Sequence, residues 1–110
     1  MKNKFNFLLI LFLIIANPLH SRDFIIVQST TSTASTGFLD YVSDIFYKES
    51  GIEVRAVAVG TGQAIKNAMR GDADLLLVHS KKDEMEFIEN GFGIERFDLM
   101  YNDFIIVGDR

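Results

Sequence analysis

Short apolar runs alternate with amphipathic helix patterns from residue 24 onward, and this alternation limits the possible folds most strongly. Apolar runs at Phe24–Val27 and Leu75–Val78 are typical of strands that are buried on both faces, and the β-branched, alanine-rich segment Ile52–Val59 is expected to form a strand between them. Consecutive strands joined through helices need crossover connections, which are right-handed and produce a parallel sheet. The sequence therefore predicts an α/β fold, with a parallel sheet and helices on both of its faces.

Amphipathic patterns predict the helices between these strands. The first helix has a single apolar face, formed by Phe38, Tyr41, Val42, Ile45 and Phe46. Polar residues occupy its other side, as in a helix that covers a sheet. Gly51 ends this helix, because glycine readily adopts the left-handed backbone that follows a last turn. A shorter helix is expected at 64–69, before Gly71.

A third helix and two further strands are expected in the last third of the chain. Ser80 and Asp83 have the three-residue spacing of a capping box, which predicts a helix start at this point. The apolar runs Phe97–Tyr101 and Phe104–Val107 are typical of strands. No repeat or low-complexity tract interrupts the pattern, so we expect one lobe without a disordered linker.

The N-terminus has the pattern of a secretory signal peptide. Two lysines precede an apolar run at 5–16, and a short polar segment follows. A membrane-spanning helix needs about 20 apolar residues, which is more than this run supplies. We expect cleavage after Ser21, with a competing site near Ala16. Residues 1–21 are therefore assigned to the signal peptide and 22–110 to the exported product.

Cysteine content and charge narrow the location and the partners. The chain contains no cysteine, so neither a disulfide nor a lipid-modified cysteine at the cleavage site is available. An exported binding protein without an anchor is expected in the periplasm. The net charge of −4 becomes more negative when the two N-terminal lysines are removed. This acidic balance argues against nucleic acid and anionic membranes as partners.

Two polar segments follow the first and second expected strands. Gln28–Thr33 and Val59–Ala64 supply hydroxyls, amides and glycines but no cation. In open α/β sheets, ligands lie at the carboxyl ends of the strands. Hydroxyls and backbone N–H groups at a helix N-terminus can bind an oxyanion without a formal counter-charge. The two segments together predict a site for a small tetrahedral anion.

Each polar segment also fits a purely structural role, because serine and threonine cap helices and glycine turns the chain. A nucleotide site is a weaker alternative. Gly60-Thr61-Gly62 follows a strand as in a dinucleotide-binding fingerprint, but Ile65 stands where the third glycine would lie.

Catalytic and metal sites have little support in the sequence. His79, Asp83 and Glu84 have helix-like spacing for a metal, but a histidine that closes a strand, followed by solvated carboxylates, explains them better. Asp72 and Asp74 flank a turn into the third strand. No pair of nucleophile and base is visible. We therefore predict neither an enzyme nor a protein that needs a metal or a cofactor.

Four segments in the right order and spacing carry a resemblance to a known family: Ser29–Thr33 with Gly37–Asp40, Val59–Ala64, Gly71–His79 and Met100–Gly108. Together they closely resemble the periplasmic tungstate-binding component of ABC importers. The resemblance implies a two-lobed, type II periplasmic binding protein with the ligand in a cleft between the lobes. It also implies six oxyanion-binding residues, which are Thr30, Thr31 and Ser32 in the first polar segment and Thr61, Gly62 and Gln63 in the second.

The resemblance places residues 22–110 in the first lobe and Tyr101–Gly108 in the crossover strand that leads to the second lobe. In this family the second lobe supplies an arginine and further hydroxyls to the anion. Arg110 directly follows the crossover strand and does not match that arginine. The second lobe is therefore expected to be absent from this chain, as in a fragment of a longer product or a truncated gene.

The function implied by the resemblance is capture of tungstate or molybdate and delivery to an ABC permease in the inner membrane. A complete receptor of this kind is expected to be a monomer. The alternatives are a phosphate- or sulfate-type receptor and a truncated fragment without high-affinity binding. Hydrogen phosphate needs an acceptor for its hydroxyl, and neither polar segment contains a carboxylate, which favours a fully ionised anion.

Overall fold

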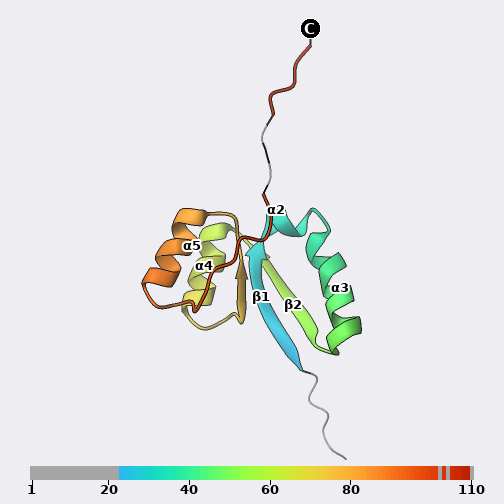
Figure 1. The fold of residues 1–110 in the computed structure, drawn as a ribbon, viewed down its shortest axis with the longest axis vertical. Coiled ribbons are helices and arrows are strands. Elements are labelled where there is room, and N and C mark those ends of the chain that lie inside the picture. The colour runs from blue at the N-terminus through green and yellow to red at the C-terminus, as the bar shows by residue number, and fades with distance from the viewer. Residues whose placement is uncertain (1–22, 102, 104, 110) are drawn as a thin grey trace, which may run out of the picture.

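The computed structural model describes residues 23–101, 103 and 105–109. The signal peptide expected at 1–21 lies outside this part of the chain and stays a prediction. Within the described part, none of the helices is long and apolar enough to cross a membrane. Figure 1 shows a small sheet flanked by helices, from which the C-terminal segment extends away.

Three parallel strands form one sheet in the order β2-β1-β3. They comprise Phe24–Thr30 (β1), Glu53–Val59 (β2) and Leu75–Leu77 (β3). Right-handed connections that move outward to β2 and then back past β1 to β3 put the connecting helices on opposite faces. The predicted α/β class and the parallel sheet are confirmed.

Four helices accompany the sheet in the described part of the chain. They comprise Thr31–Ala34 (α2), Phe38–Ser50 (α3), Thr61–Met69 (α4) and Lys81–Glu89 (α5). α3 packs against β2, whereas α4 contacts all three strands. Figure 1 shows α3 on one side of the sheet and α4 with α5 on the other. Gly51 ends α3 in the left-handed conformation with a φ of 74°, as predicted.

β1 continues three residues beyond its apolar run, through Gln28, Ser29 and Thr30. The prediction that the polar segment follows the strand is therefore wrong for these three residues. The backbone of Gln28 and Ser29 pairs with β2 on one side and with β3 on the other. All three side chains are at most 3% exposed. Pairing on both sides therefore overrides the local preference of polar residues for turns.

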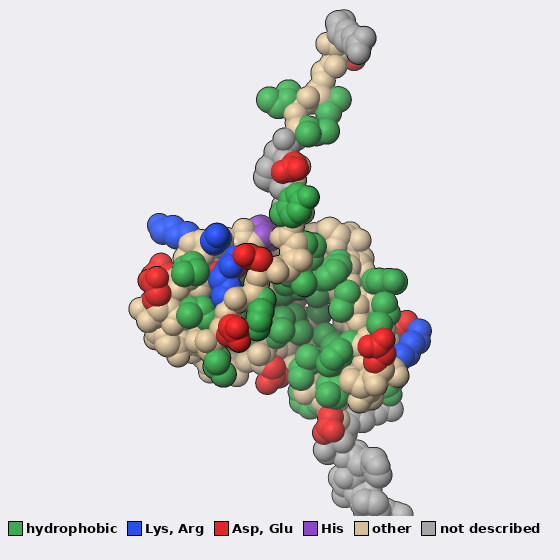
Figure 2. Space-filling view, in the orientation of Figure 1, with side chains coloured by type: hydrophobic (Ala, Val, Ile, Leu, Met, Phe, Trp, Pro, Cys, Tyr) green, Lys and Arg blue, Asp and Glu red, His purple; other side chains and the backbone are tan. Residues whose placement is uncertain are grey.

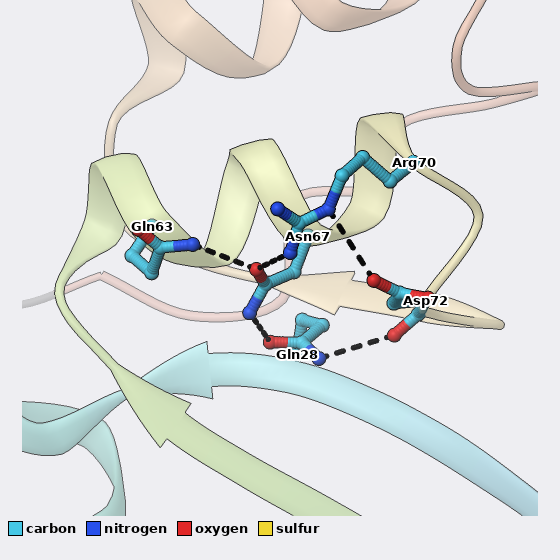
Figure 3. A network of polar contacts seen from close by, with 5 residues as sticks. All are labelled: Gln28, Gln63, Asn67, Arg70 and Asp72. Atoms are coloured by element: carbon cyan, nitrogen blue, oxygen red, sulfur yellow. Dashed lines mark hydrogen bonds and ion pairs between the residues drawn. The ribbon is translucent and has the colours of Figure 1, made fainter.

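A polar network fastens α4 to the centre of the sheet (Figure 3). The Gln28 amide donates to the Asp72 carbonyl oxygen at 3.1 Å and accepts from Asn67 Nδ2 at 3.0 Å. Asn67 Oδ1 accepts in turn from Gln63 Nε2 at 2.8 Å and from Arg70 at 2.7 Å. The buried Gln28 amide depends on these partners, because burial removes it from water. The network therefore fixes the position of α4 over β1.

Side-chain contacts hold both ends of the α5 region. α5 begins where the sequence predicts, but the expected capping box does not form. Ser80 Oγ donates to Asp83 Oδ2 at 2.6 Å and does not accept from a backbone N–H.

Arg96 forms ion pairs after the end of α5, at 2.7 Å from Glu84 and 2.7 Å from Asp98. The hydrogen bond and the charge of Arg96 hold the pKa of the Asp98 carboxyl below its usual value.

The two C-terminal strands expected from the sequence do not form in the described part of the chain. The described residues between 97 and 109 have no regular secondary structure, while Asn102 and Phe104 lie outside the described part. A strand needs a neighbour for its backbone N–H and C=O groups, and the described sheet contains only β1, β2 and β3. The apolar pattern alone cannot supply that neighbour.

The apolar face of α3 is only partly buried. Tyr41 is 69% exposed, and Val42, Ile45 and Phe46 are 37–40% exposed. α3 packs against β2 as an amphipathic helix should, but β2 leaves part of its apolar face exposed in the described part of the chain. Figure 2 shows hydrophobic side chains gathered on the surface beside α3. The buried apolar residues of the described part are Val27, Leu39 and Ala64.

We expect a protein limited to residues 22–110 to self-associate, because the exposed apolar side chains of α3 can be buried against a second copy of the chain. Ile45→Gln should weaken this association, whereas Lys48→Gln on the polar side of the same helix should leave it unchanged. Light scattering measures the association, and ANS fluorescence measures the exposed apolar surface. A monomeric protein that does not bind the dye would contradict the expectation.

Gln28→Leu should lower the free energy of unfolding by about 1–3 kcal/mol, because it leaves the Asn67 amide and the Asp72 carbonyl without their buried partner. Gln63→Ala removes an exposed member of the same network and should have a much smaller effect. Urea unfolding of the complete gene product measures both changes. Equal losses from the two substitutions would show that the buried amide has no special role.

Candidate oxyanion site

The two predicted polar segments meet at the carboxyl edge of the sheet. Thr30 and Val59 are the last residues of β1 and β2, and they are partners in the strand register. α2 begins directly after Thr30, and α4 begins at Thr61, one residue beyond Gly60. The pairing of the two strands therefore brings the starts of both helices to the same edge. Figure 1 shows α2 at the end of β1.

Thr30 organises the first segment from a buried position. Its Oγ1 atom accepts from the Thr33 N–H at 3.2 Å and thereby caps α2. The same atom lies 2.8 Å from Thr33 Oγ1 and 3.1 Å from Ser32 Oγ. Because Thr30 is only 3% exposed, its hydroxyl is engaged within the segment. Of the predicted site residues, Thr30 is the one whose side chain is least accessible.

Thr31 and Ser32 are exposed at the start of α2. The Thr31 hydroxyl makes no hydrogen bond to another residue of the described part. Ser32 Oγ lies 3.1 Å from Thr30 Oγ1 and 3.2 Å from His79 Nε2. Two hydroxyls of the first segment are thus accessible to a ligand, and one of them is already connected to a neighbouring loop.

The second segment offers backbone groups more than side chains. Gly60 precedes α4 with an extended backbone, at φ −67° and ψ 151°. Thr61 and Gly62 occupy the first two helix positions, where backbone N–H groups have no partner within the helix. A Cβ atom added to Gly60 or Gly62 would meet no atom within 4 Å, so the space above this turn is open. Gln63 directs its side-chain amide to Asn67, as Figure 3 shows.

His79 reaches the site from the end of the third strand. β3 ends at Leu77, and His79 is exposed two residues later. Its contact with Ser32 spans 47 positions in the sequence. The sequence predicts only that this histidine closes the third strand, and the contact with Ser32 is not predicted. Its place at the same carboxyl edge as the two polar segments was the signal that could have identified it.

Neutral donors dominate the candidate site. Hydroxyls come from Thr31, Ser32 and Thr61, and backbone N–H groups come from the starts of two helices. Such groups suit an anion, because the helix starts carry partial positive charge. In the described ranges, no group of three or more His, Asp or Glu side chains is placed to hold a metal ion. The chemistry of the site is therefore hydrogen bonding to an acceptor.

The chain matches the PBP superfamily domain over residues 17–110. It is 57% identical over 84 residues to the tungstate-binding protein TupA of Peptoclostridium acidaminophilum, covering 76% of this chain and 29% of that protein. It is 51% identical over 79 residues to the tungstate-binding protein TupA of Campylobacter jejuni, covering 72% of this chain and 29% of that protein. The chain thus spans under a third of the length of these curated relatives.

The chain is also similar to solved structures of a tungstate-binding protein and of a tungstate ABC transporter. The tungstate-binding protein TupA from Desulfovibrio alaskensis superposes with a TM-score of 0.72 and 47% identity, over 74% of this chain and 32% of that one. The tungstate ABC transporter structure from Geobacter sulfurreducens superposes with a TM-score of 0.70 and 42% identity, over 73% of this chain and 34% of that one. Together with the match over most of its length, these similarities show that the chain belongs to the PBP superfamily domain family.

Proposed function

We propose that the protein carrying this chain is an extracytoplasmic receptor that captures a small oxyanion, tungstate or molybdate, for import through an ABC permease. One observation carries the proposal. Two segments rich in hydroxyls and glycine meet at the ends of the paired strands β1 and β2, in a chain that is 57% identical to a tungstate-binding protein. The proposed binding residues are Thr30, Thr31, Ser32, Thr61, Gly62 and Gln63.

These six residues have different roles in the proposal. Thr31, Ser32 and Thr61 donate hydroxyl hydrogens to the anion. Gly62 and Gln63 donate their backbone N–H groups at the start of α4, where these groups have no acceptor within the helix. Thr30 is buried and positions its neighbours. A hydrogen bond to a charged group contributes about 1.5–3 kcal/mol, so a few such donors suffice for tight binding.

A second lobe completes the proposed site. A tetrahedral anion presents oxygens in all directions, whereas the two segments approach it from one edge of one sheet. The relatives are about three times as long as the matched region, which leaves room for an opposing lobe. In the proposal this lobe contributes the remaining donors, and the expected crossover segment Tyr101–Gly108 leads to it. The exposed apolar side chains of α3 also fit this proposal, because a further part of the protein could cover them.

The proposed location is the periplasm. The pattern at 1–21 directs export, and the receptor then delivers its anion to a permease in the inner membrane. A monomer without catalytic activity suffices for this task. Neither nucleic acid nor a cofactor takes part in the proposed function.

Calorimetric titration of the complete gene product tests the anion class. We expect tungstate and molybdate to bind more tightly than sulfate and phosphate. Sulfate is smaller, and hydrogen phosphate carries a hydroxyl for which the two segments offer no acceptor. Tighter binding of phosphate than of tungstate would contradict the proposed function.

Thr31→Ala and Ser32→Ala should each weaken tungstate binding by roughly tenfold or more, since each removes one hydrogen bond to a charged ligand. Neither substitution should change thermal stability much, because both side chains are exposed. Thr30→Ala provides the stability change expected for a structural residue of the same segment. It removes the cap of α2 and should cost about 1 kcal/mol of stability. Loss of stability without loss of affinity in the first two variants would support a purely structural role for the segment.

A further inference from the structure

The hydrogen bond between Ser32 Oγ and His79 Nε2 joins the first polar segment to the end of β3. We propose that His79 is a positioning residue. Its Nε2–H donates to Ser32 Oγ and so turns the Ser32 hydroxyl hydrogen toward the oxyanion. This inference rests on the proposed function and adds a third strand end to the site.

The single hydrogen of the Ser32 hydroxyl can be donated to only one acceptor at a time. The Ser32 hydroxyl has one hydrogen and lies within reach of Thr30 Oγ1 at 3.1 Å and His79 Nε2 at 3.2 Å. If Nε2 has no hydrogen, it can only accept, and it takes the single hydrogen of Ser32. Ser32 then presents only lone pairs to an anion, which repel it. If Nε2 carries a hydrogen, Ser32 accepts from it and can donate to the anion.

Thr30 is the other neighbour of the Ser32 hydroxyl, and its own hydroxyl is shared with Thr33. Its Oγ1 atom already accepts from the Thr33 N–H and has one hydrogen to share between the hydroxyls of Thr33 and Ser32. The shorter of these two contacts is the one to Thr33, at 2.8 Å. His79 Nε2, by contrast, contacts only Ser32 among the described residues, so a hydrogen on this nitrogen is directed to Ser32.

The fold holds His79 in place from both sides. On the strand side, Ser29 Oγ donates to the Leu77 carbonyl oxygen at 2.8 Å and so fixes the end of β3 to β1. On the helix side, Ser80 is bonded to Asp83 at the start of α5. The histidine itself is exposed. Its replacement should therefore alter the site without unfolding the lobe.

Substitutions at His79 test whether tungstate affinity depends on its hydrogen-bond donor or only on the volume of its side chain. His79→Leu removes the donor that orients the Ser32 hydroxyl and should weaken tungstate binding by up to roughly tenfold, the value expected if Ser32 loses its hydrogen bond to the charged ligand. His79→Gln keeps an N–H donor at a similar reach and should restore most of the affinity. Isothermal titration of the complete gene product with sodium tungstate measures both, and thermal unfolding without tungstate confirms that both variants are folded.

A double-mutant cycle distinguishes positioning from a direct contact. In a Ser32→Ala background, His79→Leu should have no further effect, because there is no hydroxyl left to orient. The same loss in both backgrounds would overturn the inference. In parallel, ¹⁵N NMR of the imidazole should show a hydrogen on Nε2 when the protein is saturated with tungstate. An unprotonated Nε2 in that state would also overturn it.

The two proposals fail in different ways. If the unmodified protein does not bind tungstate, the proposed function fails, and the inference fails with it. If the unmodified protein binds tungstate and His79→Leu binds it equally well, only the inference fails.

Discussion

Pairing of β1 with a neighbour on each side is the constraint on which the rest of the structure depends. β1 aligns with β2 over its whole length, from Phe24 opposite Glu53 to Thr30 opposite Val59, and with β3 over its C-terminal half. This pairing buries the polar end of the strand, which would be a solvated loop if it were unpaired. Burial then forces each polar group to find a partner within the protein.

The three buried polar residues of β1 each fasten a different element to the strand. Gln28 bonds to Asn67 of α4, Ser29 to the end of β3, and Thr30 to the first turn of α2. Within the described residues, no buried side-chain nitrogen or oxygen is left without a hydrogen bond. Three consecutive side chains thus locate α4, the end of β3 and α2 around the candidate site, while backbone pairing locates β2. A central strand made only of apolar residues would pack as well but would not specify these positions.

Local patterns predicted the order of strands and helices, because periodicity depends on residues a few positions apart. They also predicted which strand ends carry the polar segments. They failed wherever the outcome depends on a distant partner. β1 is longer than its apolar run because two neighbours pair with it, and the C-terminal apolar runs are not strands because they lack a neighbour among the described residues. The contact between His79 and Ser32 spans 47 positions, so periodicity does not reveal it, although the place of His79 after a strand points to the same edge of the sheet.

The alignment of Thr30 with Val59 also decides how the candidate site can change during evolution. The spacing of the two polar segments is a property of the strand register, and the segments themselves only decide which donors stand at that spacing. Substitutions in the segments can therefore change ligand preference in small steps. A deletion of one residue within β2 would instead shift the second segment by about 3.3 Å along the first and turn every following side chain to the opposite face of the sheet. In this architecture substitutions can change the donors of the candidate site, whereas a change in the length of β2 would displace the second segment.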